Sequence, residues 1–257
     1  MSKTIIFIHG MFQNDTSWKG WVDYFITKGY SCIAEPWPLH EGSPAALRAN
    51  PPAGLGDLRL EEVVDKFQKI AEQEGGEAIF IGHSVGGLIV QLLINKGLGS
   101  KGICISSVAP NRMLSFDWGF FKNSVTITNP FMGDKPFEMT ADDFYGSFGN
   151  AMSREASDEA YERTATFDSR NVLRDCMLGP GDLDTELTTR PLLFIGAEKD
   201  EIIPPDLNKK NADAYTGDLA SFLEFPDRGH FICGQPGWEE IAEYAAGWLE
   251  SQAASNL

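Results

Sequence analysis

The chain has 257 residues, 42% of them apolar, which is enough to bury the core of one large α/β domain. Its formal net charge is −16, of which −2 falls in residues 1–110 and −14 in residues 111–257. Such a surface repels nucleic acid and anionic membranes, so we exclude both as partners. We interpret the uneven charge itself as a solubility feature.

The sequence also indicates where the protein works. It has no apolar run of about 18 residues, so no membrane span is predicted. The start, MSKTIIFIHG, lacks the basic segment and cleavage site of a signal peptide. The four cysteines, which we expect to be reduced and mostly buried, are far apart: Cys32, Cys104, Cys176 and Cys233. These features predict a cytoplasmic protein.

Strand and helix signals alternate along the first part of the chain. Runs of β-branched and aromatic residues predict strands at residues 3–10, 31–38, 77–84 and 101–110. Apolar residues at helical spacing predict helices at residues 18–25, 60–71 and 85–97. The last of these helices is apolar nearly all round, so we expect it to be buried.

The alternation resumes near the end of the chain. Two further strands and two helices are predicted after residue 190, whereas residues 111–190 contain no clear strand. Continuous apolar strands that alternate with helices are typical of a sheet covered on both faces. We therefore predict an α/β fold with a mostly parallel sheet of about six strands. Residues 1–110 and 191–257 would form its core, and residues 111–190 a helical cap insertion.

Three chemically distinctive residues follow predicted strands: Ser84, Asp200 and His230. In open α/β sheets, binding sites gather at the carboxyl ends of the strands. A serine hydroxyl attacks an ester carbonyl only if a base takes its proton, and imidazole suits that task. A carboxylate then holds the imidazole in one tautomer. We predict Ser84 as nucleophile, His230 as base and Asp200 as the orienting acid.

Other carboxylates near the last two strands are rivals to Asp200, namely Glu198, Glu201, Asp206 and Asp227. Asp206 is the main alternative, although it lies inside the helix that follows the strand. The remaining histidines are interpreted differently. We expect His9 to be structural in the loop after the first strand, and His83 to pack beside the serine.

Glycines surround the candidate nucleophile. A sharp turn from strand to helix lifts Ser84 clear of the sheet, and Gly82 and Gly86 must be small for this turn to close. The negative tetrahedral intermediate also needs hydrogen-bond donors. We predict the backbone N–H groups of Val85 and Met11 as this oxyanion hole.

The combination of these residues resembles a known family. GHSVG at residues 82–86, HG at residues 9–10, and then Asp200 and His230 in that order resemble the single-domain serine esterases of the α/β-hydrolase family. The resemblance covers nearly the whole chain outside the predicted cap. It implies the α/β-hydrolase fold, an acyl-enzyme mechanism and no cofactor. Because the given sequence begins with the strand that carries HG, we expect no counterpart of the family's first two antiparallel strands.

Several stretches are similar to a bacterial subgroup described as lysophospholipase-like: WPLHEGSP, PPAGLGDL, SFDWGFFKNS, EKDEIIPP and HFICGQPGWEE. Some members of this subgroup open the lactone ring of macrolide antibiotics. The similarity implies a small-molecule ester or lactone as the substrate, with a simple ester as the other interpretation. Neither interpretation follows from a pocket residue.

Candidate substrate-binding residues come from two places. A group of aromatic residues in the predicted cap is interpreted as the cap's own core, as the roof of an apolar substrate pocket, or as both: Phe116, Trp118, Phe120 and Phe121. A lid at a lipid interface is a third interpretation, which the acidic surroundings disfavour. His40 either lines the pocket or faces solvent. The sequence GLGSKG at residues 97–102 matches GxGxxG but precedes a strand, so we interpret it as a plain turn. No metal or nucleotide site is predicted.

Two alternative functions stay open at this level. A C–C bond hydrolase or a hydroxynitrile lyase on the same scaffold also uses serine, histidine and aspartate. A non-catalytic binding protein could retain the fold without the activity. Enzymes of this fold that use a nucleophilic aspartate are excluded by Ser84.

Overall fold

The structure is a computed structural model that describes residues 3–114 and 127–254. Within these residues the chain forms one sheet, whose strands are all parallel and lie in the order β2-β1-β3-β4-β5-β6. The strands are β1 (Thr4–Ile8), β2 (Ser31–Ala34), β3 (Ile79–His83), β4 (Lys101–Ile105), β5 (Leu192–Ala197) and β6 (Ala220–Phe225). The predicted mostly parallel sheet of about six strands is confirmed.

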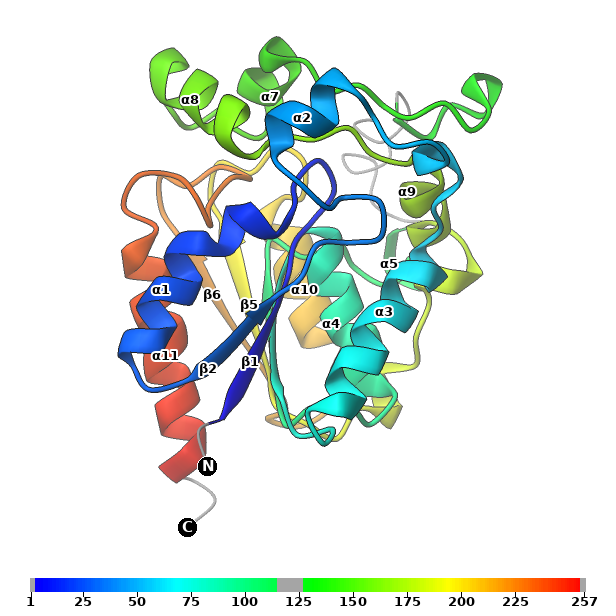
Figure 1. Ribbon diagram of the computed structural model, residues 1–257. Coiled ribbons are helices and arrows are strands. Elements are labelled where there is room, and N and C mark those ends of the chain that lie inside the picture. Colours follow the sequence, from blue (N-terminus) through cyan, green and yellow to red (C-terminus); the bar gives the residue numbers. More distant parts are fainter. Residues whose placement is uncertain (1–2, 115–126, 255–257) are drawn as a thin grey trace.

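Helices cover both faces of the sheet (Figure 1). The larger ones are α1 (Lys19–Thr27), α3 (Leu60–Gln73), α4 (Val85–Asn95), α10 (Pro205–Asp213) and α11 (Glu239–Ala254). Successive side chains of a strand point to opposite faces. Ile5 and Phe7 of β1 therefore join the core under α1 and α11, whereas Ile6 and Ile8 join the core under α3, α4 and α10.

Two helices illustrate how the sequence specifies this packing. Every side chain of α4 from Val85 to Ile94 is buried, as its apolar composition predicts. Helix α3 buries one face and exposes the other. It ends just before Gly75 and Gly76, whose φ angles of 81° and 74° are in the left-handed region that favours glycine.

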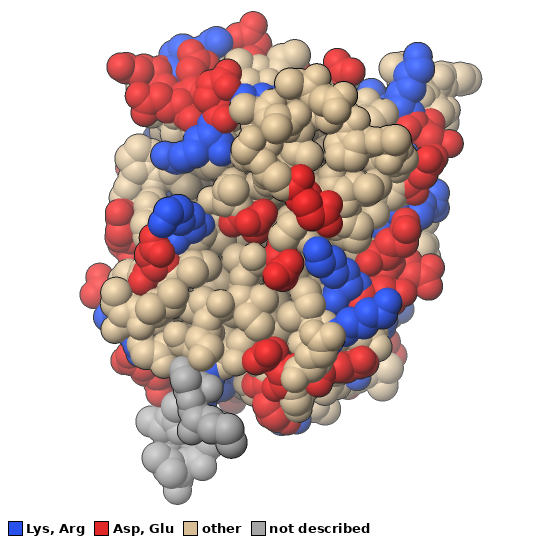
Figure 2. Space-filling model, viewed as in Figure 1, with Lys and Arg blue, Asp and Glu red and all other residues tan. Residues whose placement is uncertain are grey.

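The described residues between β4 and β5 are mainly helical. They contain α5 (Asn111–Leu114), α7 (Ala141–Ser147), α8 (Arg154–Thr164) and α9 (Arg170–Cys176). The only bridge of strand type described here joins Phe137 to Asp168. In Figure 1, α7 and α8 lie above the carboxyl ends of the strands, together with α2 (Pro44–Ala49). Figure 2 shows acidic side chains gathered over α8, where Glu155, Glu159 and Glu162 are exposed.

Shorter elements complete the described chain. Single 3₁₀ turns lie at Asp15–Trp18, Leu55–Asp57, Pro130–Met132, Gly179–Gly181 and Thr185–Leu187. No described helix is both long enough and apolar enough to cross a membrane. The four cysteines are free thiols, of which Cys32 is half-buried and the others are buried.

Strand β3 and helix α4 are in very close contact. A Cβ atom on Gly82 would overlap the backbone carbonyl of Gly86, and it would lie 2.7 Å from Cγ2 of Val90. Backbone atoms of a buried helix cannot move aside as a flexible side chain can. The direct contact between strand and helix therefore requires glycine at position 82.

We predict that Gly82→Ala lowers the free energy of unfolding by about 1–3 kcal/mol or more, because overpacking forces the backbone apart. Gly247→Ala is the matched control, since a Cβ there meets nothing within 4 Å and the residue is exposed in α11. Alanine at that helical position should be neutral or stabilising by up to about 1 kcal/mol. Urea unfolding of both variants measures the difference. Equal stabilities of the two variants would contradict the close packing of β3 on α4.

Candidate active site

The carboxyl ends of β3, β5 and β6 bring Ser84, Asp200 and His230 together. The Ser84 Oγ–H group donates to Nε2 of His230 at 3.1 Å, and Nδ1–H of His230 donates to Oδ2 of Asp200 at 2.8 Å. A carboxylate only accepts hydrogen bonds, so Nδ1 carries the proton and Nε2 is free to accept from the serine. The three residues are buried, with Ser84 6% exposed, Asp200 3% and His230 0%.

Ser84 stands on the turn between β3 and α4 in a strained conformation. Its φ of 57° and ψ of −119° are unusual for a residue with a side chain. Its backbone is held on both sides, because its N–H donates to Ile105 O at 2.9 Å and its carbonyl accepts from Val108 N–H at 3.1 Å. A Cβ on Gly10 would lie 2.8 Å from Ser84 Cβ, and one on Gly86 would overlap carbonyls at the end of β1. The serine is thus raised into the site between segments that approach closely.

Asp200 lies in the loop after β5 and is held by its second carboxylate oxygen. Oδ1 accepts the N–H groups of Ile202 at 2.9 Å and Ile203 at 2.8 Å, while Oδ2 faces His230. The carboxylate therefore has one orientation. The rival carboxylates considered from the sequence are all exposed at the surface: Glu198, Glu201, Asp206 and Asp227.

His83 supports the backbone of the candidate base. Its Nε2–H donates to the carbonyl of His230 at 2.8 Å, and the two rings lie 4.8 Å apart. Burial, with a further contribution from the charge of His230, lowers the pKa of His83 to about 3. His83 is therefore neutral at ordinary pH, and it packs beside the serine turn as expected.

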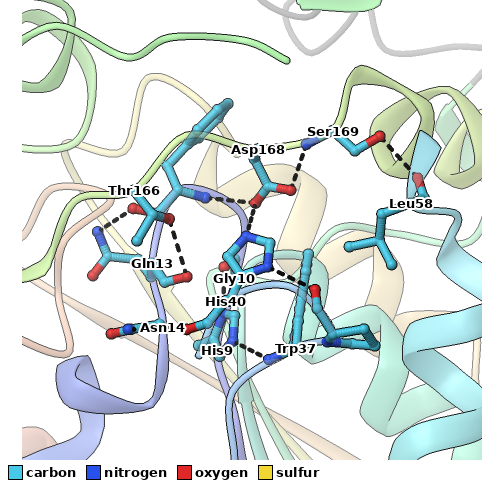
Figure 3. A network of polar contacts seen from close by, with 12 residues as sticks. His9, Gly10, Gln13, Asn14, Trp37, His40, Leu58, Thr166, Asp168 and Ser169 are labelled. Carbon is cyan, nitrogen blue, oxygen red and sulfur yellow. Dashed lines mark hydrogen bonds and ion pairs between the residues drawn. The ribbon is translucent and has the colours of Figure 1, made fainter. Parts of the chain in front are cut away.

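The structure places His40 neither in the cavity lining nor in solvent, the two positions left open by the sequence. Its side chain is buried, and its Nε2 lies 3.4 Å from Oδ2 of Asp168 (Figure 3). His9, which was expected to be structural, lies beside it. The N–H of Trp37 donates to Nε2 of His9 at 2.9 Å, and Nδ1–H of His9 donates to Gly10 O at 2.8 Å. Burial, followed by the charge of His40, lowers the pKa of His9 well below its usual value.

A cavity of about 460 Å³ opens above the serine. Ser84 and His230 lie in its lining beside Met11 and Val85, whose N–H groups are the predicted oxyanion donors. The rest of the described lining is mostly apolar: Phe12, Val108, Ile127, Phe137, Met139, Phe148, Leu173, Ile202 and Ile203. Three acidic residues also line the cavity: Asp142, Asp143 and Glu201.

The described lining contains aromatic residues that the sequence analysis did not single out. The predicted pocket residues Phe116, Trp118, Phe120 and Phe121 lie outside the described residues. Phe137 and Phe148 line the cavity, and the ring of Phe148 meets His230 edge-on, with the ring centroids 4.8 Å apart. Neither was distinguishable in the sequence from an ordinary core phenylalanine, because the segment that carries them has no sustained periodicity. Within residues 3–114 and 127–254, no group of His, Cys, Asp and Glu side chains could hold a metal ion.

Comparison with known proteins agrees with this architecture. A model of the alpha/beta hydrolase family matches residues 5–243. The chain belongs to the alpha/beta hydrolase family. A search of curated proteins found no significant match to the sequence.

Solved structures share the fold at low sequence identity. A monoacylglycerol lipase from Paleococcus ferrophilus superposes with a TM-score of 0.73 at 19% identity, over 96% of this chain and 94% of that one. A thermophilic esterase from Thermogutta terrifontis superposes with a TM-score of 0.73 at 14% identity, over 98% of this chain and 90% of that one. A pyrethroid hydrolase from Sphingobium faniae JZ-2 superposes with a TM-score of 0.73 at 18% identity, over 99% of this chain and 100% of that one.

The neutral state of His83 predicts how the protein responds to acid. In the unfolded chain the pKa of a histidine is about 6.5, whereas in the fold that of His83 is about 3. Between these values the unfolded state binds one more proton, so stability is lost as the pH falls. The slope from this residue is at most about 1.4 kcal/mol per pH unit.

We predict that His83→Gln, which keeps a donor for the His230 carbonyl, reduces the loss of unfolding free energy between about pH 6.5 and about pH 4. Urea unfolding of the wild type and the variant at both pH values measures the loss. His9 is present in both proteins, so its contribution cancels in the comparison. A loss in the variant equal to that in the wild type would mean that His83 is not held neutral by the fold.

Proposed function

We propose that this protein is a serine hydrolase that cleaves carboxylic esters through an acyl-enzyme intermediate. The observation that carries the proposal is the hydrogen-bonded series from Ser84 through His230 to Asp200 at the base of an apolar cavity. A serine that donates to a histidine, which in turn donates to a buried carboxylate, is the arrangement that activates a hydroxyl for attack on a carbonyl carbon.

In the first half of the reaction, Ser84 Oγ bonds to the ester carbonyl carbon while its proton passes to Nε2 of His230. Asp200 stabilises the resulting imidazolium through Nδ1–H. The carbonyl oxygen becomes an oxyanion, which accepts hydrogen bonds from the N–H groups of Met11 and Val85. Collapse of this intermediate breaks the C–O bond, and His230 gives its proton to the departing alcohol oxygen.

The second half repeats these steps with water. His230 takes a proton from a water molecule, whose oxygen bonds to the acyl carbon of Ser84. The new oxyanion occupies the same pair of backbone donors. Collapse releases the carboxylic acid, and the proton returns to Ser84. No cofactor is needed, because each proton removed by His230 is delivered to the next leaving oxygen.

The cavity indicates the class of ester. Its volume of about 460 Å³ is within the range of pockets that enclose small organic ligands, and its walls suit an apolar acyl or alkoxy group. Structures of the same fold include proteins named as a monoacylglycerol lipase and a pyrethroid hydrolase. The similarity of the sequence to the lysophospholipase-like subgroup adds a lactone, such as a macrolide ring, as the more specific candidate substrate.

We predict that Ser84→Ala abolishes hydrolysis, lowering kcat by about 10⁴-fold or more. The experiment is mass spectrometry of a panel of short and long acyl esters, a lysophospholipid and macrolides of different ring size, incubated with wild type or variant. A macrolide product heavier by one water only with the wild type would identify a lactone-opening enzyme. Turnover of simple esters alone would identify a simple esterase.

Additional probes test the alternative functions. A serine-directed phosphonate should modify the wild type and not Ser84→Ala, whereas a non-catalytic binding protein would react in neither form. Cleavage of a C–C substrate or a cyanohydrin without any ester hydrolysis would favour the other enzyme classes. Full ester hydrolysis by Ser84→Ala would disprove the proposed mechanism.

We predict that Asp200→Asn lowers kcat by about 10⁴-fold, because an amide in place of the carboxylate favours the wrong tautomer of His230. Asp206→Asn is the matched control, since this aspartate also follows β5 but is exposed on α10. Exposed substitutions far from the reacting atoms should leave kcat within about twofold of the wild type. Initial rates with a p-nitrophenyl ester measure both. A larger loss in Asp206→Asn than in Asp200→Asn would reassign the acid.

A further inference from the structure

The loop that carries the proposed oxyanion donor Met11 is strained at the next residue. Phe12 has a φ of 63°, in the left-handed region that a bulky residue rarely adopts. A conformation of this kind persists only where surrounding contacts enforce it. Both Met11 and Phe12 line the cavity, so a change in this backbone would move the N–H of Met11 relative to Ser84.

Contacts from the segment between β4 and β5 hold the Phe12 peptide groups. The N–H of Phe12 donates to Oδ2 of Asp168 at 2.9 Å, and the carbonyl of Phe12 accepts from Thr166 N–H at 2.9 Å. The other carboxylate oxygen of Asp168, Oδ1, accepts the N–H of Ser169 at 2.7 Å. The Asp168 side chain is 0% exposed, so the carboxylate that holds the loop is out of water (Figure 3).

A buried carboxylate needs a counter-charge, and His40 is placed to supply it. Its Nδ1 lies 3.1 Å from the carbonyl of Pro38, which can only accept, so Nδ1 carries a proton. Its Nε2 faces Asp168 Oδ2 at 3.4 Å, which is longer than a good hydrogen bond and is an ion-pair contact. A proton on Nε2 as well as on Nδ1 would make the ring an imidazolium that faces this carboxylate.

The groups around His40 agree with a positive charge. Burial by itself would lower the pKa of His40, but the charge and polar contact of Asp168, with smaller effects of Pro38 O and Glu41, raise it overall. The other titratable group that packs against the ring is His9, whose centroid lies 5.7 Å away. His9 is neutral, since burial and the charge of His40 lower its pKa.

We propose that His40 and Asp168 form a buried ion pair whose role is to position the oxyanion hole. Asp168 holds the strained Phe12 peptide, and His40 holds the Asp168 carboxylate in place. Both are positioning residues, because they act on the reaction through the loop and do not line the cavity. The inference rests on the proposed function, since it assigns these residues a role in stabilising the oxyanion of that reaction.

The test compares Asp168→Asn with Asp175→Asn. Asp175 is a matched control because it is also buried, lies in the same segment, accepts the N–H of Leu60 at 3.1 Å and pairs with Arg59 at 2.6 Å. It does not contact the loop after β1 in any of these bonds. Both variants should lower Tm, since each removes the charge of a buried carboxylate that pairs with a basic side chain.

The activity readout separates positioning from stability. With p-nitrophenyl butyrate, Asp168→Asn should lower kcat by about 10–100-fold with little change in KM, as expected when a catalytic donor is displaced. A trifluoromethyl ketone forms a hemiketal oxyanion on Ser84, so its affinity should fall by the same factor. The corresponding trifluoromethyl carbinol carries no oxyanion, and its affinity should not change. Asp175→Asn should alter none of these quantities.

A second variant and a spectroscopic measurement cover the case in which Asp168→Asn does not fold. His40→Gln retains the carboxylate but removes the cation, and it should lower kcat and ketone affinity together by about 3–10-fold. In the wild type, NMR titration of His40 should give a midpoint above the ordinary value of about 6.5. The stabilisation from the pair is therefore present below about pH 6.5 and is lost as the pH rises through that midpoint.

The outcomes distinguish two failures. If Ser84→Ala retains ester hydrolysis, or the wild type does not bind the trifluoromethyl ketone more tightly than the carbinol, the proposed function itself is wrong. If Ser84 is required but Asp168→Asn and His40→Gln keep the wild-type ratio of ketone to carbinol affinity, only the positioning role is wrong. A titration midpoint of His40 at or below about 6.5 would also overturn it, because the ring would then be neutral.

Discussion

The close approach of backbone segments around Ser84 is the constraint on which the rest of the site depends. The end of β1, the end of β3 and the start of α4 meet so closely that Gly10, Gly82 and Gly86 leave no room for a Cβ atom. This packing keeps Ser84 in a strained conformation, with its N–H and carbonyl bonded to neighbouring backbone. The hydroxyl therefore projects from a rigid turn, and its distance to His230 is set by the sheet.

The histidines of this region are similarly buried but have different partners. His83 and His9 each use one N–H to satisfy a backbone carbonyl, and desolvation keeps both neutral. His40 has a carboxylate within reach, and that carboxylate outweighs the cost of burial. Similar burial thus accompanies neutral rings at His83 and His9 and, in the proposed pair with Asp168, a cation at His40. The partner of each ring, more than its degree of exposure, decides its role.

Directional polar contacts fasten the segment between β4 and β5 to the sheet domain. Arg59 binds Asp175 through two nitrogens, Arg48 donates to the carbonyl of Ala165, and Asp168 meets both His40 and the Phe12 peptide. The segment also supplies Phe137 and Phe148 to the cavity wall. This one segment therefore contributes to the cavity wall over the serine and also holds the loop after β1.

The sequence alone determined the parallel sheet and the positions of Ser84, Asp200 and His230 at the carboxyl ends of its strands. Continuous apolar runs and the spacing of glycines indicate which segments are buried strands and tight turns. Because the strands are parallel, residues that directly follow them lie together at the carboxyl edge of the sheet. Only the tertiary structure decided the partner of His40, the role of Asp168 and the identity of the aromatic lining. Periodicity shows that a residue is buried but not which distant polar group it meets, and residues 40 and 168 come together only through the fold of the intervening segment.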